Sequence, residues 1–173
     1  PIKINVVALK GHNDQELVKM ARLSLEYPFH VRFIEYMPIG NSRMHAGDSI
    51  LAPEIRKQIE ALGKLMPVEK NQMDGPAERF RFEGAPGEIG FICPMSRHFC
   101  AACNRLRLTA DGHIRPCLLS DRMVDIKGPM RAGCSDDDIA DIFKKAVGYK
   151  QDAHHFSGDP AFKVTDQMSG IGG

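Results

Sequence analysis

The chain of 173 residues has no apolar run near the roughly 20 residues that a membrane-spanning helix needs. It also lacks an excess of one charge, because 23 Lys and Arg stand against 22 Asp and Glu, a formal net charge of +1. This balance excludes the basic field with which proteins bind nucleic acids or anionic membranes non-specifically. Arginines that matter for function must therefore act locally.

Cysteines are few, and repeats and low-complexity segments are absent. The five cysteines are odd in number and unevenly placed, which argues against a disulfide framework and predicts free thiols in the cytoplasm. The chain is long enough for one sizeable core. It begins at Pro1 and enters the apolar segment IKINVVAL almost at once, which we interpret as a sign of a processed product or of a piece of a longer protein.

The hydrophobic pattern predicts a fold of the α/β to α+β class. Residues 2–9 are rich in β-branched side chains and predict a buried strand, residues 13–27 a helix, and residues 30–37 a second strand. A strand, a helix and a strand with short joints form a βαβ unit with parallel strands. Such folds hold their chemistry past the C-terminal ends of the strands, so Met37 should face the candidate site.

The pattern changes after a further predicted helix over residues 53–62. The segments ERFRFEG and EIGFI alternate at period two and predict an antiparallel hairpin. A last helix is predicted over residues 135–148, with an inward face of Ile139, Ile142, Phe143 and Ala146. We predict two domains, residues 1–70 and residues 71–173, the second holding all five cysteines and ending in a Gly-Gly tail.

The most informative stretch is FCAACNRLRLTADGHIRPC. Cys100 and Cys103 stand two residues apart, and Cys117 follows after thirteen more. Three thiols in so short a span can hold a metal centre and leave one coordination position for another ligand. If RLRLT is a strand, one face carries Cys103, Arg105 and Arg107, and Leu106 and Leu108 pack behind.

The turn at ADG decides on which face Cys117 lies. A two-residue turn would place Cys117 opposite Leu106, away from the other cysteines. A three-residue loop with Gly112 in the left-handed conformation places Cys117 opposite Arg105, on the cysteine face. We predict the three-residue loop, because only it brings the thiols together without further distortion.

The cysteine spacing alone leaves the occupant open. Zinc would take three thiolates and a histidine, for which His98 and His113 are candidates. An iron-sulfur cluster suits three cysteines equally well. A redox C-x-x-C pair fits less well, since these cysteines lead into a strand and not into a helix N-terminus. The remaining thiols, Cys93 and Cys134, are most simply small buried hydrophobes.

The two arginines of the stretch also have two interpretations. As the solvated face of a hairpin they would be ordinary, since arginine is mostly exposed. Beside a metal, the rigid fork of a guanidinium matches phosphate or carboxylate, and two on one face suit a triphosphate. Lys3, early in the first strand, is either a further phosphate contact or an ordinary charged residue.

Taken together, FCAACNRLRLTADGHIRPCLL, IKINVV, RFIEYM and the final IGG resemble the C-terminal half of the GTP 3',8-cyclase (MoaA) family of molybdenum cofactor biosynthesis. The resemblance covers nearly the whole chain. It implies a radical S-adenosylmethionine lyase with an incomplete (βα)6 TIM-type barrel and two 4Fe-4S clusters, which converts GTP to a cyclic pyranopterin precursor. It also implies that the C-terminal 4Fe-4S cluster is held by Cys100, Cys103 and Cys117, with its open iron bound to the guanine of GTP.

The resemblance further implies the residues around the substrate. Those that contact GTP fall on Lys3, Arg105, Leu106 and Arg107. The methionine that lines the S-adenosylmethionine site falls on Met37. The terminal Gly172 and Gly173 match the glycine pair that reaches into the active-site pocket.

The motif C-x-x-x-C-x-x-C, which the family uses for its other cluster, is absent from this chain. The resemblance therefore predicts a substrate-side half, inactive by itself, whose partners are GTP and the N-terminal half of the enzyme. S-adenosylmethionine and the second cluster belong with that other half. Half a barrel leaves strand edges open, which predicts a homodimer. The alternative is a non-catalytic zinc- or nucleotide-binding module, expected to be a monomer.

Overall fold

The chain forms two compact units in the computed structural model, which describes residues 1–40, 46–69, 75–97, 100, 103–150, 164–166 and 168–171. The first unit consists of Pro1–Met37 and Met44–Phe99, and the second of Pro38–Arg43 and Cys100–Gly173. Each unit has its own hydrophobic core. The mixture of helices and strands confirms the predicted α/β to α+β class.

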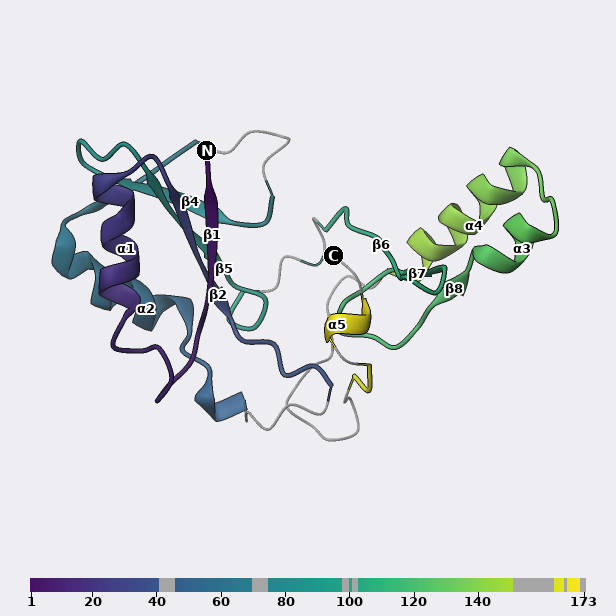
Figure 1. Ribbon diagram of the computed structural model, residues 1–173, viewed down its shortest axis with the longest axis horizontal. Helices are drawn as coiled ribbons and strands as arrows, with labels where there is room; N and C mark the ends of the chain where they lie inside the picture. The colour runs from purple at the N-terminus through teal and green to yellow at the C-terminus, as the bar shows by residue number, and fades with distance from the viewer. Residues whose placement is uncertain are drawn as a thin grey trace. The chain divides into compact units, whose positions relative to one another are not determined.

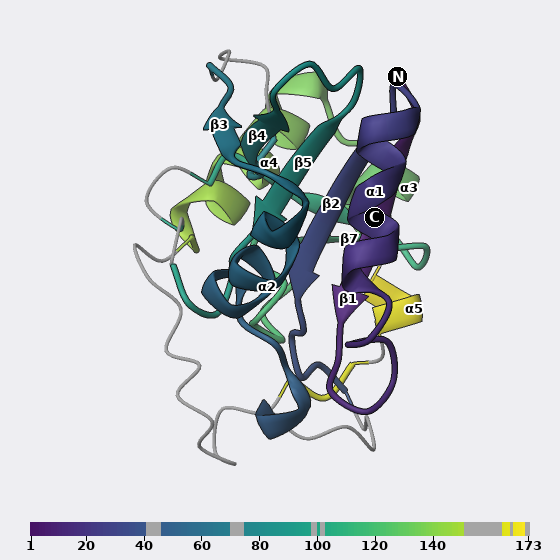
Figure 2. The same cartoon turned by 90° about the vertical axis from the view of Figure 1, so that its left-hand side faces the viewer.

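The first unit is a five-stranded sheet with two helices on one face (Figures 1 and 2). Its strands are β1 (Lys3–Ala8), β2 (His30–Glu35), β3 (Leu65–Pro67), β4 (Glu78–Phe82) and β5 (Glu88–Ile92). Its helices are α1 (Leu17–Glu26) and α2 (Ala52–Ile59), with the short 3-10 helices η1 (Ala46–Asp48) and η2 (Glu60–Leu62). The strand order is β1-β2-β5-β4-β3, in which β1, β2 and β5 are parallel and the other pairs antiparallel.

The core of this unit lies between the sheet and its helices. Every second strand residue points into it, as the period of two requires, and Val31 and Ile89 are fully buried there. Leu17 and Ala21 of α1 are also fully buried, as are Ile55 and Ile59 of α2. The opposite face of the sheet is therefore the one on which polar side chains such as Lys3 can lie.

The predicted βαβ unit and the predicted hairpin are both confirmed. The hairpin is part of the same sheet as the parallel strands, because β5 pairs with β2 from His30 to Ile34. The first compact unit thus continues past residue 70, where we placed a domain boundary, to Phe99. The sheet is open, with β1 and β3 as its edges among the described strands.

The predicted start of α1 is wrong by four residues. The helix begins at Leu17, because the side chain of Asn13 is used elsewhere. Its Oδ1 accepts a hydrogen bond from the N–H of Leu9 at 2.9 Å, and its Nδ2 donates to the carbonyl of Val7 at 2.8 Å. Asn13 thereby closes the loop after β1 instead of capping the helix.

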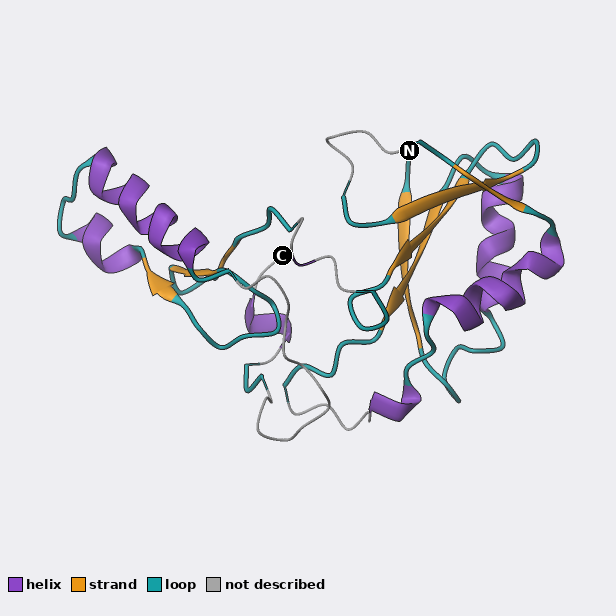
Figure 3. Cartoon of the chain, turned by 180° about the vertical axis from the view of Figure 1, so that it is seen from behind, coloured by secondary structure: helices purple, strands orange, loops and turns teal. Residues whose placement is uncertain are grey.

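The second unit combines a small antiparallel sheet with helices (Figure 3). Its strands are β6 (Arg107–Leu108), β7 (His113–Arg115) and β8 (Val124–Asp125), and its helices are α3 (Lys127–Arg131), α4 (Asp136–Gly148) and α5 (Met168–Ile171). The core consists of Ile114, Val124, Ile126 and Ala146, with Leu106, Ile139, Ile142 and Tyr149 packed against them. Ser135 caps α4 in a capping box with Asp138, as its predicted start requires.

Two expectations about the packing of this unit are wrong. Leu108 is 65% exposed, because it belongs to β6, an edge strand that has a neighbouring strand, β7, on one side only. Phe143 is 43% exposed, although it stands next to Ile142, which packs on the core. The inward face of α4 is therefore narrower than its apolar pattern indicates.

No helix in the described residues is long and apolar enough to cross a membrane.

Candidate functional site

The hairpin that carries the cysteines and arginines turns through a three-residue loop, as predicted. Leu108 pairs with Ile114, and the N–H of Thr109 donates to the carbonyl of His113 at 2.9 Å, which leaves three residues for the loop. Gly112 has φ +90°, and a Cβ there would approach Lys127 Cβ to 2.5 Å. Only glycine suits this position, which confirms the left-handed prediction.

The register of this hairpin places Arg107 directly opposite Arg115. If this register is extended by two residues beyond the pair of Arg107 and Arg115, Cys117 falls opposite Arg105, which agrees with the predicted register. The sequence analysis did not identify Arg115, although it has the same parity as Cys117 and stands two residues before it. Three arginines therefore meet on the face that also carries the cysteines.

Arg107 lies half-buried in this basic surrounding. Its pKa is held below the usual value, first because burial removes water from the guanidinium and then because Arg105 and Arg115 add like charges. Cys103 and Cys117 act in the opposite direction and therefore lie close to it. Within the described part of the chain, no carboxylate pairs with Arg107 or Arg105. No described carboxylate therefore competes with an anionic ligand for their charge.

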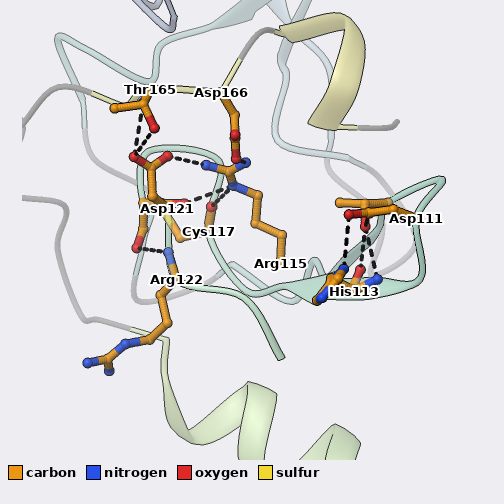
Figure 4. Close-up of polar contacts among 10 residues, drawn as sticks. Asp111, His113, Arg115, Cys117, Asp121, Arg122, Thr165 and Asp166 are labelled. Carbon is orange, nitrogen blue, oxygen red and sulfur yellow. Dashed lines mark hydrogen bonds and ion pairs between the residues drawn. The ribbon is translucent and has the colours of Figure 1, made fainter. Parts of the chain in front are cut away.

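Arg115, in contrast, is neutralised and fully buried (Figure 4). Its two terminal nitrogens pair with Asp121 Oδ1 at 2.8 Å and with Asp166 Oδ2 at 2.7 Å. Its Nε donates to the carbonyls of Ser120 at 2.8 Å and of Cys117 at 3.3 Å. The side chain thus fixes the loop after Cys117 and joins it to the segment that precedes α5.

Asp121 completes this network from its other oxygen (Figure 4). Oδ2 accepts hydrogen bonds from the N–H and the Oγ1 of Thr165, both at 2.9 Å. Burial raises the pKa of Asp121, but the Thr165 hydrogen bonds and the Arg115 charge outweigh it and keep the pKa below the usual value. The carboxylate is therefore ionised in its role as the bridge between Arg115 and Thr165.

The cysteines are all free thiols, and three of them are half-buried around the hairpin. Cys100 and Cys103 are the ends of one turn, in which the N–H of Cys103 donates to the carbonyl of Cys100 at 3.0 Å. Among the described residues, no three His, Cys, Asp or Glu side chains converge closely enough to bind a metal ion. His98 lies outside the described residues, and His113 stands 3.1 Å from Asp111. No preformed zinc site is therefore present in the described residues.

Lys3 belongs to the first unit and lines a cavity of about 150 Å³ on the face of the sheet away from the helices. Its walls also include Arg32, Arg79 and His30, of which Arg79 pairs with Glu88 and His30 has its pKa lowered by burial. One carboxylate, Glu88, lies there and is 3% exposed. The role of Lys3 as a phosphate contact stays a prediction.

The remaining predicted site residues lie in different parts of the chain. Met37 is half-buried and follows the end of β2 by two residues, in the first unit. Gly172 and Gly173 lie outside the described residues. Leu106 lies between Arg105 and Arg107 and packs its side chain on the core of the second unit, so it offers a ligand its backbone.

Glu88 should make the stability of the first unit depend on pH. Hydrogen bonds from Arg79, at 2.8 and 3.0 Å, and from Arg81, at 2.7 Å, hold the pKa of Glu88 below its ordinary value of 4.5 against the effect of burial. The stabilisation is complete above pH 4.5 and is lost as the pH falls through the lowered pKa of the folded state. We expect the difference in melting temperature between the wild type and E88Q to shrink between pH 6 and pH 3.

The control for this measurement is E78Q. Glu78 pairs with Arg97 at 2.8 Å, but both side chains are exposed, so the variant should differ little from the wild type at any pH. A difference between the wild type and E88Q that is constant with pH would contradict the role assigned to Glu88.

Comparison with known proteins relates this chain to a protein family. The family model described as Molybdenum Cofactor Synthesis C matches residues 29–156. The chain belongs to this family. The matched segment contains the three half-buried cysteines of the hairpin and the arginines beside them.

The chain is also similar to curated GTP 3',8-cyclases. That of Moorella thermoacetica is 47% identical over 173 residues, and that of Pelotomaculum thermopropionicum 45% over 175 residues; each match covers 100% of this chain and 53% of the relative. The enzyme of Thermodesulfovibrio yellowstonii is 47% identical over 151 residues, which are 87% of this chain and 47% of the relative. The chain thus spans about half the length of the curated relatives it matches.

The three thiols of this Molybdenum Cofactor Synthesis C chain fit the donor set of an iron-sulfur cluster. Zinc needs four ligands at one small centre, whereas a cluster is wider and keeps its cysteines further apart. Cys103 and Cys117 share the surroundings of Arg107, and Cys100 is joined to Cys103 by a turn. Thiols near Arg107, with Arg105 beside it, suit an anionic centre.

One further residue of this site was missed in the sequence. Lys150 follows α4 and places its Nζ 3.6 Å from the Sγ of Cys103. No spacing rule relates it to a cysteine 47 positions earlier, because the return of α4 onto the hairpin brings them together. The sequence alone indicated only that a lysine is common near the C-terminus of a helix.

Proposed function

We propose that this chain is the substrate-side half of a radical S-adenosylmethionine GTP 3',8-cyclase, in which the second unit binds GTP. Cys100, Cys103 and Cys117 would hold the 4Fe-4S cluster, and Arg105 and Arg107 would bind phosphates. The cluster, when bound, supplies an iron with an open position for the guanine. The reaction is the conversion of GTP to the cyclic pyranopterin precursor of molybdenum cofactor synthesis.

The observation that carries this proposal is the position of Arg107. Its guanidinium lies half-buried near Cys103 and Cys117 and next to Arg105, and neither of these two arginines pairs with a carboxylate among the described residues, whereas Arg115 is neutralised by Asp121 and Asp166. Like charges in such proximity destabilise a fold unless a ligand neutralises them. A triphosphate would provide the negative charge that neutralises these arginines. We propose GTP as the nucleotide because relatives of the chain are named GTP 3',8-cyclase.

Several finer parts of the proposal concern the rest of the enzyme. The open sheet of the first unit would be part of an incomplete (βα)6 TIM-type barrel, with Lys3 as a phosphate contact and Met37 lining the S-adenosylmethionine site. Gly172 and Gly173 would reach the active-site pocket. The motif C-x-x-x-C-x-x-C is absent here, so the chain would act only with the N-terminal half. We also propose a homodimer and, from the free thiols, a cytoplasmic location.

The cluster is tested by anaerobic reconstitution of the chain with iron and sulfide. We expect a brown protein with broad visible absorption and about four iron and four sulfide per chain, the stoichiometry of a 4Fe-4S centre. C103S and C117S should lose most of this absorption, whereas C93S should retain it, because Cys93 is buried in the first unit. A colourless product that binds one zinc would overturn the proposal in favour of a zinc-binding module.

GTP binding is tested on the same reconstituted chain. Replacing Arg107 with alanine should weaken GTP binding by about 1.5–3 kcal/mol, roughly 10- to 100-fold, because one charged hydrogen-bond donor to phosphate is lost. The matched control is R131A, since Arg131 is exposed at the end of α3. Titration calorimetry with GTP measures both. Equal affinity of R107A and R131A would argue against a phosphate contact at Arg107.

A further inference from the structure

Lys150 lies where the end of α4 meets the cysteine hairpin. Its own N–H donates to the carbonyl of Val147 at 2.9 Å, which completes the last turn of the helix. The preceding Tyr149 packs on the core of the second unit and stacks under Arg122, whose guanidinium carbon is 4.5 Å from the ring centre. The backbone that carries the lysine is therefore fixed against the hairpin on two sides.

Among the described residues, the ammonium group of Lys150 has three acceptors. Nζ donates to the carbonyl of Arg105 at 2.7 Å and to the carbonyl of Pro116 at 3.1 Å. Its third neighbour is the Sγ of Cys103 at 3.6 Å, within the range of an N–H···S hydrogen bond. An ammonium has three N–H donors, so this arrangement uses each of them once.

The two carbonyls stand on opposite sides of the hairpin, just beyond the last ladder pair of Arg107 and Arg115. One precedes Cys117 and the other follows Cys103 by two residues. Lys150 therefore continues the pairing of the strands at the point where Pro116 cannot donate a hydrogen bond. It holds the two cysteine-bearing segments at a set distance. Within the described residues, no carboxylate pairs with this lysine.

We propose that Lys150 is a positioning residue of the cysteine site, which sets the spacing of Cys103 and Cys117 and raises the reduction potential of the cluster through its hydrogen bond to Cys103. The inference rests on the proposed function. A reduced cluster is more negative than an oxidised one, so an N–H donor and a positive charge at a cysteine sulfur favour reduction. In the half-buried surroundings this effect is weakly screened.

A simpler role for Lys150 is that of a C-terminal lysine that binds carbonyl groups near a helix end. That role would affect stability only. The two roles predict different effects on the reduction potential when the lysine is replaced, because the hydrogen bonds to the carbonyl groups do not involve the cysteine sulfur. A measurement of potential at full cluster occupancy therefore separates them.

The test compares K150M, K150R and the control K145M in the chain reconstituted with iron and sulfide. Lys145 is an exposed lysine on α4, the helix that Lys150 follows. We expect K150M to shift the reduction equilibrium toward the oxidised form by about tenfold, which is 59 mV for a one-electron couple. K150R, which keeps the charge and N–H donors, and K145M should stay near the wild type. A redox titration followed by electron paramagnetic resonance measures the potential, and iron analysis measures occupancy.

The outcomes separate this inference from the proposed function. If the wild type takes up no cluster, the proposed function fails and the role of Lys150 with it. If the wild type and K150M hold equal iron and have the same potential, only the inference fails. Should K150M lose its fold, K150Q replaces it, because its amide keeps two N–H donors and removes the charge. A wild-type potential in K150Q would then overturn the role of the ammonium.

Discussion

Replacing Arg115 with methionine is expected to destabilise the second unit by about 3 kcal/mol. The side chain is fully buried, and its loss leaves Asp121 and Asp166 without their cation and the carbonyls of Cys117 and Ser120 without a donor. The cost stays at the low end for a broken buried ion pair, because the carboxylates are 38% and 41% exposed and water partly replaces the arginine.

The same change should release the loop after Cys117. Urea unfolding of R115M measures the loss of stability, and alkylation followed by mass spectrometry measures how fast Cys117 reacts in the reduced chain. We expect faster alkylation at Cys117 and an unchanged rate at Cys134, which is far along the chain at the start of α4. R115K should fall between, because one ammonium has three donors for four acceptors.

The matched control is R131M, because Arg131 is exposed on α3. We expect this variant to change the free energy of unfolding by no more than about 0.5 kcal/mol. If R115M unfolds at the same urea concentration as R131M, the network around Arg115 contributes nothing to the unit. If Cys117 reacts at its wild-type rate in R115M, the loop is held by other contacts.

The sequence was informative where a local rule decides the structure. The period of the strands, the glycine at the hairpin turn and the serine before α4 each depend on a few neighbouring residues, and the structure agrees with all three. The register of the cysteine hairpin was predictable for the same reason, since loop length alone determines which residues face each other.

The rest depends on partners that are distant in sequence. Asp166 reaches Arg115 across 51 positions and Lys150 reaches Cys103 across 47, and neither pairing leaves a spacing pattern. The exposure of Leu108 follows from its edge strand, and that of Phe143 from the narrow contact of α4. Burial and ion pairing of this kind are properties of the folded unit, which explains why the sequence predicted candidate ligands and missed the residues that contact them.

Replacing Glu35 with glutamine is expected to destabilise the first unit by about 2–5 kcal/mol, since each buried donor left unpaired costs about 1–3 kcal/mol. The carboxylate is 1% exposed at the end of β2 and accepts from four donors. Oε1 accepts from the N–H of Ala52 at 2.9 Å and from the hydroxyl of Ser96, and Oε2 from the N–H groups of Met95 and Ser96 at 2.9 and 2.8 Å.

A glutamine has the same shape but cannot replace this acceptor. One of its two ends is an NH2 group, so either orientation turns a donor toward at least one of these N–H groups. The loss also reaches α2, because Ala52 is its first residue and Leu51 before it offers no side-chain cap. A negative charge at a helix N-terminus is favourable, and the variant removes it.

Urea unfolding of E35Q, beside the exposed control E60Q, tests this prediction. Glu60 pairs with Arg56 on the surface, where such a pair contributes about 0.5 kcal/mol or less. Equal stability of the two variants would mean that water or another donor arrangement satisfies the turn at residues 95 and 96. A large loss in E35Q alone would show that one carboxylate joins β2, the start of α2 and the segment that leads to Cys100, so that the first unit and the approach to the cysteines depend on the same buried charge.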